Sequence, residues 1–236
     1  MSRGMPGRGF PWMAGMLLLG LTGCQTTPPA APAPTSAESV PAPRVSPGAR
    51  KLSVMTEESL LQILVYRGGV MSRLGHNHVI ASRHLVGEIL VAEDAAQTRF
   101  DIRVPVNDLT VDEPAMREQA GPDFPAGVPQ SARDGTRRNL LSEALLDGAN
   151  YPEIRLRAIE ASGSGDHFDV TVEVAIKGQS RRVRVPVQLT REAETLRARG
   201  EFPLRQSDLG LKPFSVAMGT LVVLDEMKIR FDVIAR

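Results

Sequence analysis

The 236-residue sequence has a single cysteine, few aromatic residues and almost no net charge. Cys24 is that cysteine, so no disulfide can form within the chain. Aromatic residues make up 4%, which argues against stacking platforms for bases or sugars. The formal charge is +1, but Arg3 and Arg8 lie in a segment that we expect to be removed, leaving 26 basic against 27 acidic residues. This balance gives no electrostatic basis for nucleic-acid binding.

The N-terminal apolar run, Phe10 to Leu21, is short for a membrane span, which needs about 20 apolar residues. Its position behind Arg3 and Arg8 is typical of a secretory signal. The run ends in Leu21-Thr22-Gly23-Cys24, which resembles a bacterial lipobox with Cys24 as the lipid acceptor. The alternative is an ordinary secreted protein with an incidental cysteine.

Three regions are therefore expected: a lipoprotein signal peptide at 1–23, a tether at 24–50 and a folded domain at 51–236. The tether has seven prolines and six alanines between Gln25 and Arg50, a composition typical of an extended spacer. Lipidation predicts a periplasmic location in a bacterial cell envelope. Gln25 after the cysteine, by resemblance to outer-membrane lipoproteins, favours the outer over the inner membrane.

The domain is dominated by apolar and polar residues that alternate with period two, the pattern of half-buried strands. About eight strands follow, joined by short turns. Their centres lie near residues 60–66, 85–91, 100–106, 154–158, 170–176, 183–189, 196–204 and 227–233.

One helical segment interrupts the alternation. We expect a short helix from Asn139 that closes at Gly148, before Tyr151-Pro152 starts the next strand. The stretch from Asp112 to Thr136 reads as an exposed excursion. The helix would act as a lid or plug on the sheet. The predicted fold class is all-β with a helical insert.

Strands with one apolar face must bury that face, and eight of them can curl into an antiparallel barrel. The predicted interior is mostly Val, Leu, Ile and Ala. Such residues either pack a filled core, as in a structural lipoprotein, or leave a narrow apolar cavity.

Several short motifs resemble the YceI-like, polyisoprenoid-binding domains over roughly Leu60 to Ala235. The likeness rests on the order and spacing of these blocks. They are Arg133-Asp134, Leu140-x-Ser142, Leu146-Asp147, Tyr151-Pro152-x-Ile154, Gln206-Ser207-Asp208-Leu209-Gly210 and Asp225-Glu226-Met227-Lys228-Ile229. The chain departs from the family at Asn139, where a histidine is common.

The resemblance implies an extended, lipocalin-like barrel that carries an isoprenoid, a quinone or another long-chain, lipid-like amphiphile. The expected function is a membrane-anchored periplasmic binding protein for such a ligand. The candidate ligand-binding residues are Leu64, Tyr66, His76, His78, His84, Phe100, Val172, Phe202 and Phe231. The oligomeric state is not indicated.

His76, His78 and His84 would share one face if the chain from Gly75 to His84 is extended. They could be structural, bind the polar head of a ligand, or ligate a metal. A metal site would need further ligands, for which Asp134 is one possible carboxylate.

The sequence carries no nucleophile elbow, phosphate loop, dinucleotide fingerprint or Cys-x-x-Cys pair. We therefore expect a protein without a cofactor that is not an enzyme. A His-dependent metal-binding protein or enzyme on the same barrel stays open.

Overall fold

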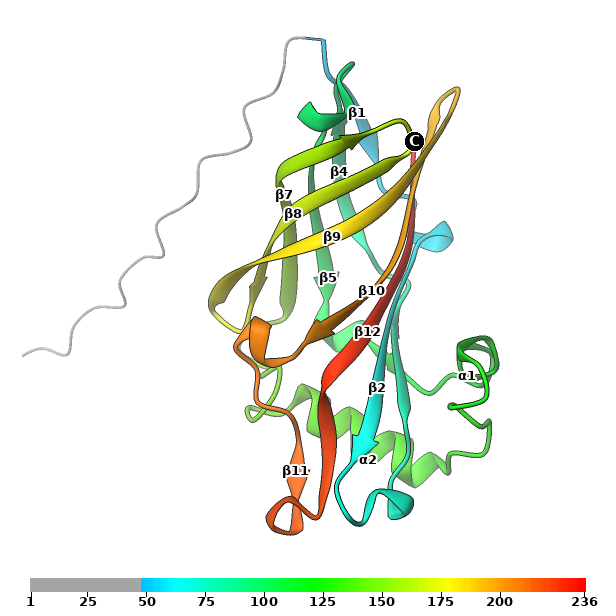
Figure 1. Ribbon diagram of the computed structural model, residues 1–236, viewed down its shortest axis with the longest axis vertical. Coiled ribbons are helices and arrows are strands. Elements are labelled where there is room, and N and C mark those ends of the chain that lie inside the picture. The colour runs from blue at the N-terminus through cyan, green and yellow to red at the C-terminus, as the bar shows by residue number, and fades with distance from the viewer. Residues whose placement is uncertain (1–47) are drawn as a thin grey trace, which may run out of the picture. The chain divides into compact units, whose positions relative to one another are not determined.

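The computed structural model describes residues 48–236, so the predicted signal peptide, Cys24 and nearly all of the predicted tether lie outside the described residues. The described part is one antiparallel sheet of twelve strands (Figure 1). The strands are β1 (Arg50–Ser53), β2 (Leu60–Gly68), β3 (His78–Ser82), β4 (Val86–Val91), β5 (Arg99–Pro105), β6 (Thr110–Val111), β7 (Glu153–Ser164), β8 (His167–Ile176), β9 (Gln179–Glu192), β10 (Thr195–Arg205), β11 (Ser215–Val216) and β12 (Leu221–Ala235).

Two α-helices lie between β6 and β7: α1 (Pro114–Ala120) and α2 (Gln130–Leu141). The helical insert is confirmed, but its predicted bounds are wrong. The helix starts nine residues before Asn139, inside the supposed excursion, and it ends at Leu141. Asp147, not Gly148, takes the left-handed backbone conformation, with φ of 51°. Within residues 48–236, neither helix is long and apolar enough to span a membrane.

Eleven of the twelve strands correspond to eight long ones, because three of the eight are kinked and each of these is divided into two. β1 with β2, β3 with β4, and β5 with β6 each form one bent strand, interrupted at 54–59, 83–85 and 106–109. Each half pairs with the matching half of its neighbour: β2 with β3, and β1 with β4. The predicted antiparallel barrel is thus confirmed, but the strand count differs. The strands predicted near 60–66, 85–91 and 100–106 cover only β2, β4 and β5, and the other halves, β1, β3 and β6, were not predicted. The short β11 pairs only with β12.

The first and last long strands close the barrel. β2 pairs with β12 from Asp232↔Leu60 to Val222↔Gly68. Beyond the kink, Ser53 and Arg236 exchange two backbone hydrogen bonds of 2.7 and 3.0 Å. The Met55 N–H also donates to the Ile234 carbonyl at 2.8 Å. The same bent strand therefore contacts β12 along its length and leaves no free edge there.

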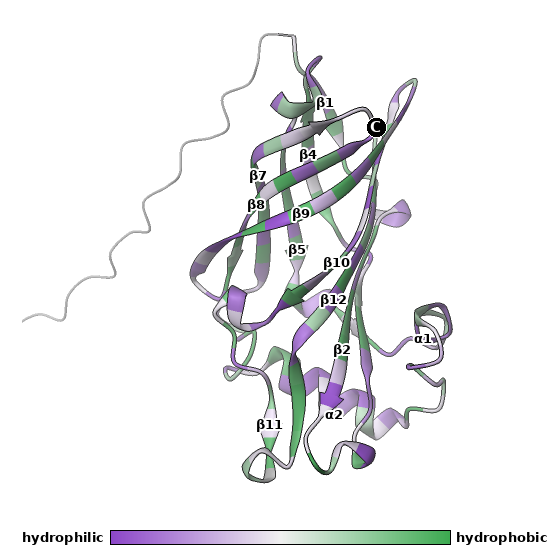
Figure 2. Ribbon diagram, in the orientation of Figure 1, coloured by the Kyte–Doolittle hydropathy of each residue, from purple (hydrophilic) through white to green (hydrophobic). Residues whose placement is uncertain are grey.

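The apolar faces of the strands point inward, as period two predicts, and apolar and hydrophilic residues alternate along β8 and β9 (Figure 2). In β8, Val170, Val172, Val174 and Ile176 belong to the main buried cluster. In β9, Arg182 and Arg184 are exposed while Val183 is buried.

The wall has one incomplete seam, between β9 and β10. These strands pair only from Thr195↔Glu192 to Arg199↔Gln188 and then separate. A Cβ atom on Gly200 would lie 2.4 Å from the Pro186 carbonyl oxygen, so the Pro186 backbone faces β10. If the register continued, Glu201 would face Pro186. Pro203, two residues further along β10, would direct its backbone toward β9 in the same way as Glu201. Proline has no N–H, so neither Pro186 nor Pro203 can donate. Two donors that the ladder would need are therefore missing.

Candidate functional site

The barrel encloses an apolar cavity of about 380 Å³. Its walls come from all eight long strands and from α2, and they are almost entirely aliphatic side chains and phenylalanines. Four of the candidate residues line it away from its polar end, namely Phe100, Val172, Phe202 and Phe231.

Most of the polar lining residues gather where α2 lies against the barrel, whereas Thr98, next to the start of β5, lies away from this end. His76 and His78 lie at the start of β3, Arg67 near the end of β2, and Thr136 and Asn139 one turn apart on α2. Leu140 and Leu146 from the same insert also line the cavity. The insert therefore supplies both apolar and polar groups at this end, giving an apolar tube with one polar end. We call this polar end, formed by Arg67, His76, His78, Thr136 and Asn139, the head site.

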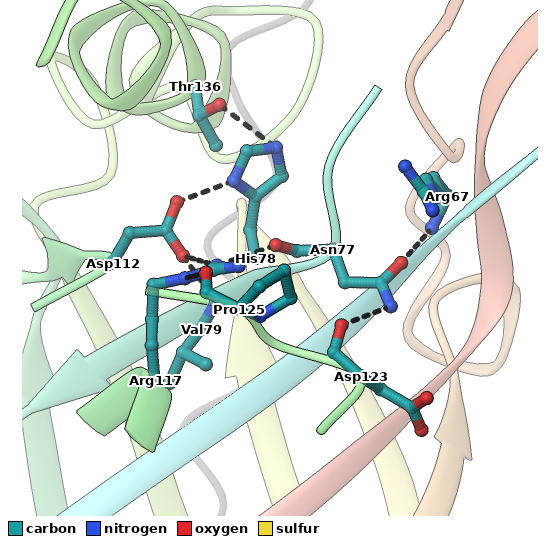
Figure 3. Close-up of polar contacts among 9 residues, drawn as sticks. All are labelled: Arg67, Asn77, His78, Val79, Asp112, Arg117, Asp123, Pro125 and Thr136. Carbon is teal, nitrogen blue, oxygen red and sulfur yellow. Dashed lines mark hydrogen bonds and ion pairs between the residues drawn. The ribbon is translucent and has the colours of Figure 1, made fainter. Parts of the chain in front are cut away.

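The imidazole of His78 is held by a buried carboxylate, Asp112 (Figure 3). Nδ1 of His78 lies 2.6 Å from Oδ2 of Asp112, while Oδ1 accepts the Val79 N–H at 2.9 Å. Asp112 itself has φ of 56°, a left-handed conformation that Asp tolerates better than most residues. Its N–H donates to the Val79 carbonyl at 2.8 Å. These bonds fix the carboxylate beneath the start of β3.

Arg117 of α1 neutralises the same carboxylate from the outer side of the barrel. It is 1% exposed and forms a buried ion pair with Asp112. Its guanidinium also donates to the carbonyls of Asn77, at 2.7 Å, and Pro125, at 2.8 Å (Figure 3). The same guanidinium lies over the ring of Phe124. The helix α1 is thereby tied to the loop that enters β3.

The protonation of this group follows from its contacts. Burial raises the pKa of the Asp112 carboxyl, but hydrogen bonds from His78, Val79 and Arg117 outweigh it and hold that pKa below its ordinary value. An ionised carboxylate can only accept, so Nδ1 of His78 carries the proton. Nε2 is then the ring nitrogen toward α2, 3.3 Å from Oγ1 of Thr136.

His76 lies beside His78, with ring centroids 6.1 Å apart. Burial lowers the pKa of His76, and the electrostatic influence of the neighbouring His78 and Arg117 lowers it further. A neutral imidazole is thus favoured at this position, one that can donate or accept a hydrogen bond.

The structure brings together only part of the predicted site. The expectation that three histidines share one face is wrong, because the chain bends after Ser82 and His84 pairs with Asp108 at 3.1 Å outside the cavity lining. Leu64 and Tyr66 also lie outside that lining. They belong to a separate apolar cluster with Met116 and Phe124 on the other face of β2. Whether any candidate residue binds a ligand stays a prediction.

Among residues 48–236, no group of three or more histidine, cysteine, aspartate or glutamate side chains could hold a metal ion. Asp134, the carboxylate considered for this role, accepts a hydrogen bond from Gln130 one turn earlier on α2.

Asp112, Arg117 and Thr136 were not predicted as site residues. All three lie in the stretch interpreted as an exposed excursion, where no apolar periodicity marks an element. One available signal was Pro114, because proline is favoured at the first position of a helix and α1 begins there.

The fold resembles those of solved structures, two of which match over most of this chain. The crystal structure of Burkholderia cenocepacia BcnA matches with a TM-score of 0.57 and 16% identity, covering 78% of this chain and 99% of that one. A polyisoprenoid binding domain from Saccharophagus degradans, implicated in plant cell wall breakdown, matches with a TM-score of 0.53 and 13% identity, covering 78% and 97%. At these identities the likeness concerns the fold alone.

Among curated proteins, none matches the chain by sequence. The YceI-like domain family does match, over residues 70–235, which is most of the chain and includes His76, His78, α2 and the β7–β12 wall. The chain therefore belongs to the YceI-like domain family.

Proposed function

We propose that this protein is a lipid-anchored periplasmic binding protein that carries a polyisoprenoid or another long-chain amphiphile inside its barrel. One observation carries the proposal: a 380 Å³ apolar cavity has most of its hydrogen-bonding side chains gathered at one end, where α2 lies. An apolar chain gains by leaving water along its whole length, whereas a head group needs polar partners when it is buried. Family membership and the binding activity named for the S. degradans domain support the same ligand class.

The head site favours an uncharged group such as a hydroxyl, a quinone carbonyl or an amide, because Arg67, the cation at this end of the lining, is exposed to solvent and donates to the Gly75 carbonyl. The buried charges of Asp112 and Arg117 already neutralise each other. His78, with Nδ1 donating to Asp112, has Nε2 left to interact at the cavity end. Thr136 can donate and accept, and the Asn139 amide can do both at once. A matching head group would therefore find partners without bringing in an uncompensated charge.

The test is mass spectrometry of organic extracts from the purified protein, with ligand stoichiometry measured. His76→Gln and His78→Gln should lower the retained amphiphile. His84→Gln is the matched control, since His84 lies outside the cavity lining, and it should retain the wild-type amount. Extracts of the wild type without a stoichiometric long-chain species would contradict the proposal. Equal loss in all three variants would contradict the head site.

A second function, His-dependent hydrolysis, is favoured by one feature only. Asp112, His78 and Thr136 form a carboxylate–imidazole–hydroxyl series with distances of 2.6 and 3.3 Å. In this scheme Nε2 of His78 would take the Thr136 proton while Oγ1 attacks an ester carbonyl. The ester C–O bond would then break, the alcohol would leave with that proton, and water would hydrolyse the acyl-threonine to restore the hydroxyl. Turnover of an activated long-chain ester that is lost in both His78→Gln and Thr136→Val would support hydrolysis. Equal turnover in the wild type and both variants would exclude it.

The anchoring part of the proposal rests on the sequence around Cys24 and the proline-rich tether. A lipidated Cys24 would retain the barrel at a membrane surface, and the tether would let it reach away from that surface.

A further inference from the structure

Six of the eight large hydrophobic residues that are exposed within residues 48–236 occur at one end of the barrel. They lie on or next to two loops: Gly69–Gly75, which includes a 3₁₀ turn at Ser72–Leu74, and the β11–β12 turn with its flanks. Val70, Leu74 and Met218 are 89%, 69% and 104% exposed. Single exposed apolar residues are ordinary, but a group of this kind marks an interaction surface. The group is Val70, Met71, Leu74, Val216, Met218 and Leu224.

The two loops form a single unit. The Met71 N–H donates to the Thr220 carbonyl at 2.8 Å. Gly69, with φ of 86°, approaches the same carbonyl so closely that a Cβ atom would lie 2.4 Å from the oxygen. Figure 1 shows both loops projecting beyond the barrel at the end where α2 lies, opposite to β1. We call this unit the apolar tip, residues 69–75 and 215–221.

The apolar tip borders the cavity. Gly75 and Leu221 from the tip, with Val222 beside it, line the cavity together with His76. The lower part of β12, next to β11, is continuously apolar (Figure 2). A path along the tip toward the head site would therefore be hydrophobic.

The two segments that form the tip and its immediate flanks carry charge of one sign. Segments 67–75 and 211–221 contain three basic residues, Arg67, Arg73 and Lys212, and no acidic residue. All three are exposed. Projecting apolar side chains flanked by cations match the interface of an anionic phospholipid bilayer, where the apolar groups enter the acyl region and the cations meet the head groups.

We infer that the apolar tip docks onto an anionic lipid bilayer, with Val70, Leu74 and Met218 inserted. A projecting pair of loops suits a fluid lipid surface, which needs no matching groove. The passage of ligand between bilayer and cavity rests on the proposed function, whereas the membrane contact itself does not.

The experiment uses residues 25–236, which lack the lipid acceptor and keep every described strand and both apolar clusters. Sedimentation with phosphatidylglycerol-containing vesicles should recover this protein, and neutral phosphatidylcholine vesicles should recover less. Val70→Asp with Met218→Asp should reduce partitioning by about tenfold or more, because two charges replace inserted side chains. Asp also tolerates the left-handed backbone at Met218, with φ of 53°. Val86→Asp is the matched control: Val86 is 44% exposed on β4, away from the tip, and this variant should bind like the wild type.

A second readout uses fluorescence. Trp12, in the predicted signal peptide, is the only tryptophan of the chain, so Val70→Trp creates a unique reporter in residues 25–236. Its emission should shift to the blue on mixing with anionic vesicles. Ligand content is measured by mass spectrometry on the same preparations, which separates the two proposals. Vesicle binding without ligand would uphold the membrane contact and contradict the proposed function.

Three results would overturn the inference. The first is a wild type that fails to bind anionic vesicles while still holding its ligand. The second is equal loss of binding in the Val86→Asp control. The third is that Val70→Asp with Met218→Asp abolishes self-association of the protein but leaves vesicle binding unchanged, which would mean that the tip contacts a second copy of the protein and not a bilayer.

Discussion

Nδ1 of His78 lies 2.6 Å from Oδ2 of Asp112, and the same carboxylate neutralises the buried guanidinium of Arg117. One side chain thus orients a histidine of the cavity and compensates a charge outside it. The head site and the outer cluster around α1 are therefore coupled through Asp112.

The first prediction is that Asp112→Asn destabilises the fold by about 3–5 kcal/mol, because it leaves the Arg117 charge buried without its partner. Asn also tolerates positive φ, so backbone strain does not confuse the result. Urea unfolding measures the change. The matched control is Asp108→Asn, whose ion pair with His84 is about half exposed and should contribute less than about 1 kcal/mol. Equal losses in the two variants would contradict the assignment.

The second prediction concerns pH. The folded state lowers the pKa of Asp112, so its stabilisation is present above the unfolded pKa of about 3.9 and is lost as pH falls through the lower folded value. The difference in unfolding free energy between the wild type and Asp112→Asn should be full at pH 6 and shrink below about pH 4. Urea titrations at several pH values measure it. A difference that grows on acidification would reverse the sign and refute the argument.

The third prediction tests the inward face. Val172→Asp should destabilise by several kcal/mol, on the order of 3, because a carboxylate would face the apolar cavity. Arg184→Asp, on the exposed side of β9, disrupts only an exposed ion pair with Asp169 and should cost about 1 kcal/mol or less. Thermal and urea unfolding of both variants measure the contrast. Similar behaviour of the two would mean that the period-two pattern does not report the inside of this barrel.

The fourth prediction is that Cys24 is the first residue of the mature protein and bears lipid. Cys24→Ser should abolish labelling by a radioactive fatty acid and leave the precursor unprocessed or the protein soluble. Cell fractionation and intact mass measure this outcome. Wild-type processing and membrane retention in the variant would contradict lipidation.

Period two predicted the barrel well because strands with one buried face record burial directly in the sequence. Val170, Val172 and Val174 alternate with residues of the outer face, and no other fold feature is needed to place them. The kinks are different. The outward position of Leu64 and Tyr66 also escaped prediction. They point to the outer face of β2, where α1 and Phe124 cover them, and this covering depends on contacts that are distant in sequence.

The head site was harder to predict for a related reason. α2 begins in the polar run Gln130–Asn139, which shows no apolar stripe, and Arg137 fastens it by donating to the Asn107 carbonyl at 2.6 Å. Helices held by such hydrogen bonds leave little periodicity. Asp112 and Arg117 are five residues apart within a charged stretch, where burial of both is the exception.

The incomplete seam has a consequence for solubility. Where β9 and β10 separate, each presents backbone groups that no neighbouring strand of the barrel satisfies, and such edges can recruit strands of other molecules and start aggregation. Pro186 and Pro203 withhold donors at this seam, and Arg182, Arg184 and Glu201 place exposed charges beside it. Replacing both prolines by valine would give each edge a complete set of donors. The same two residues that keep the barrel wall parted therefore protect the protein from intermolecular β-pairing.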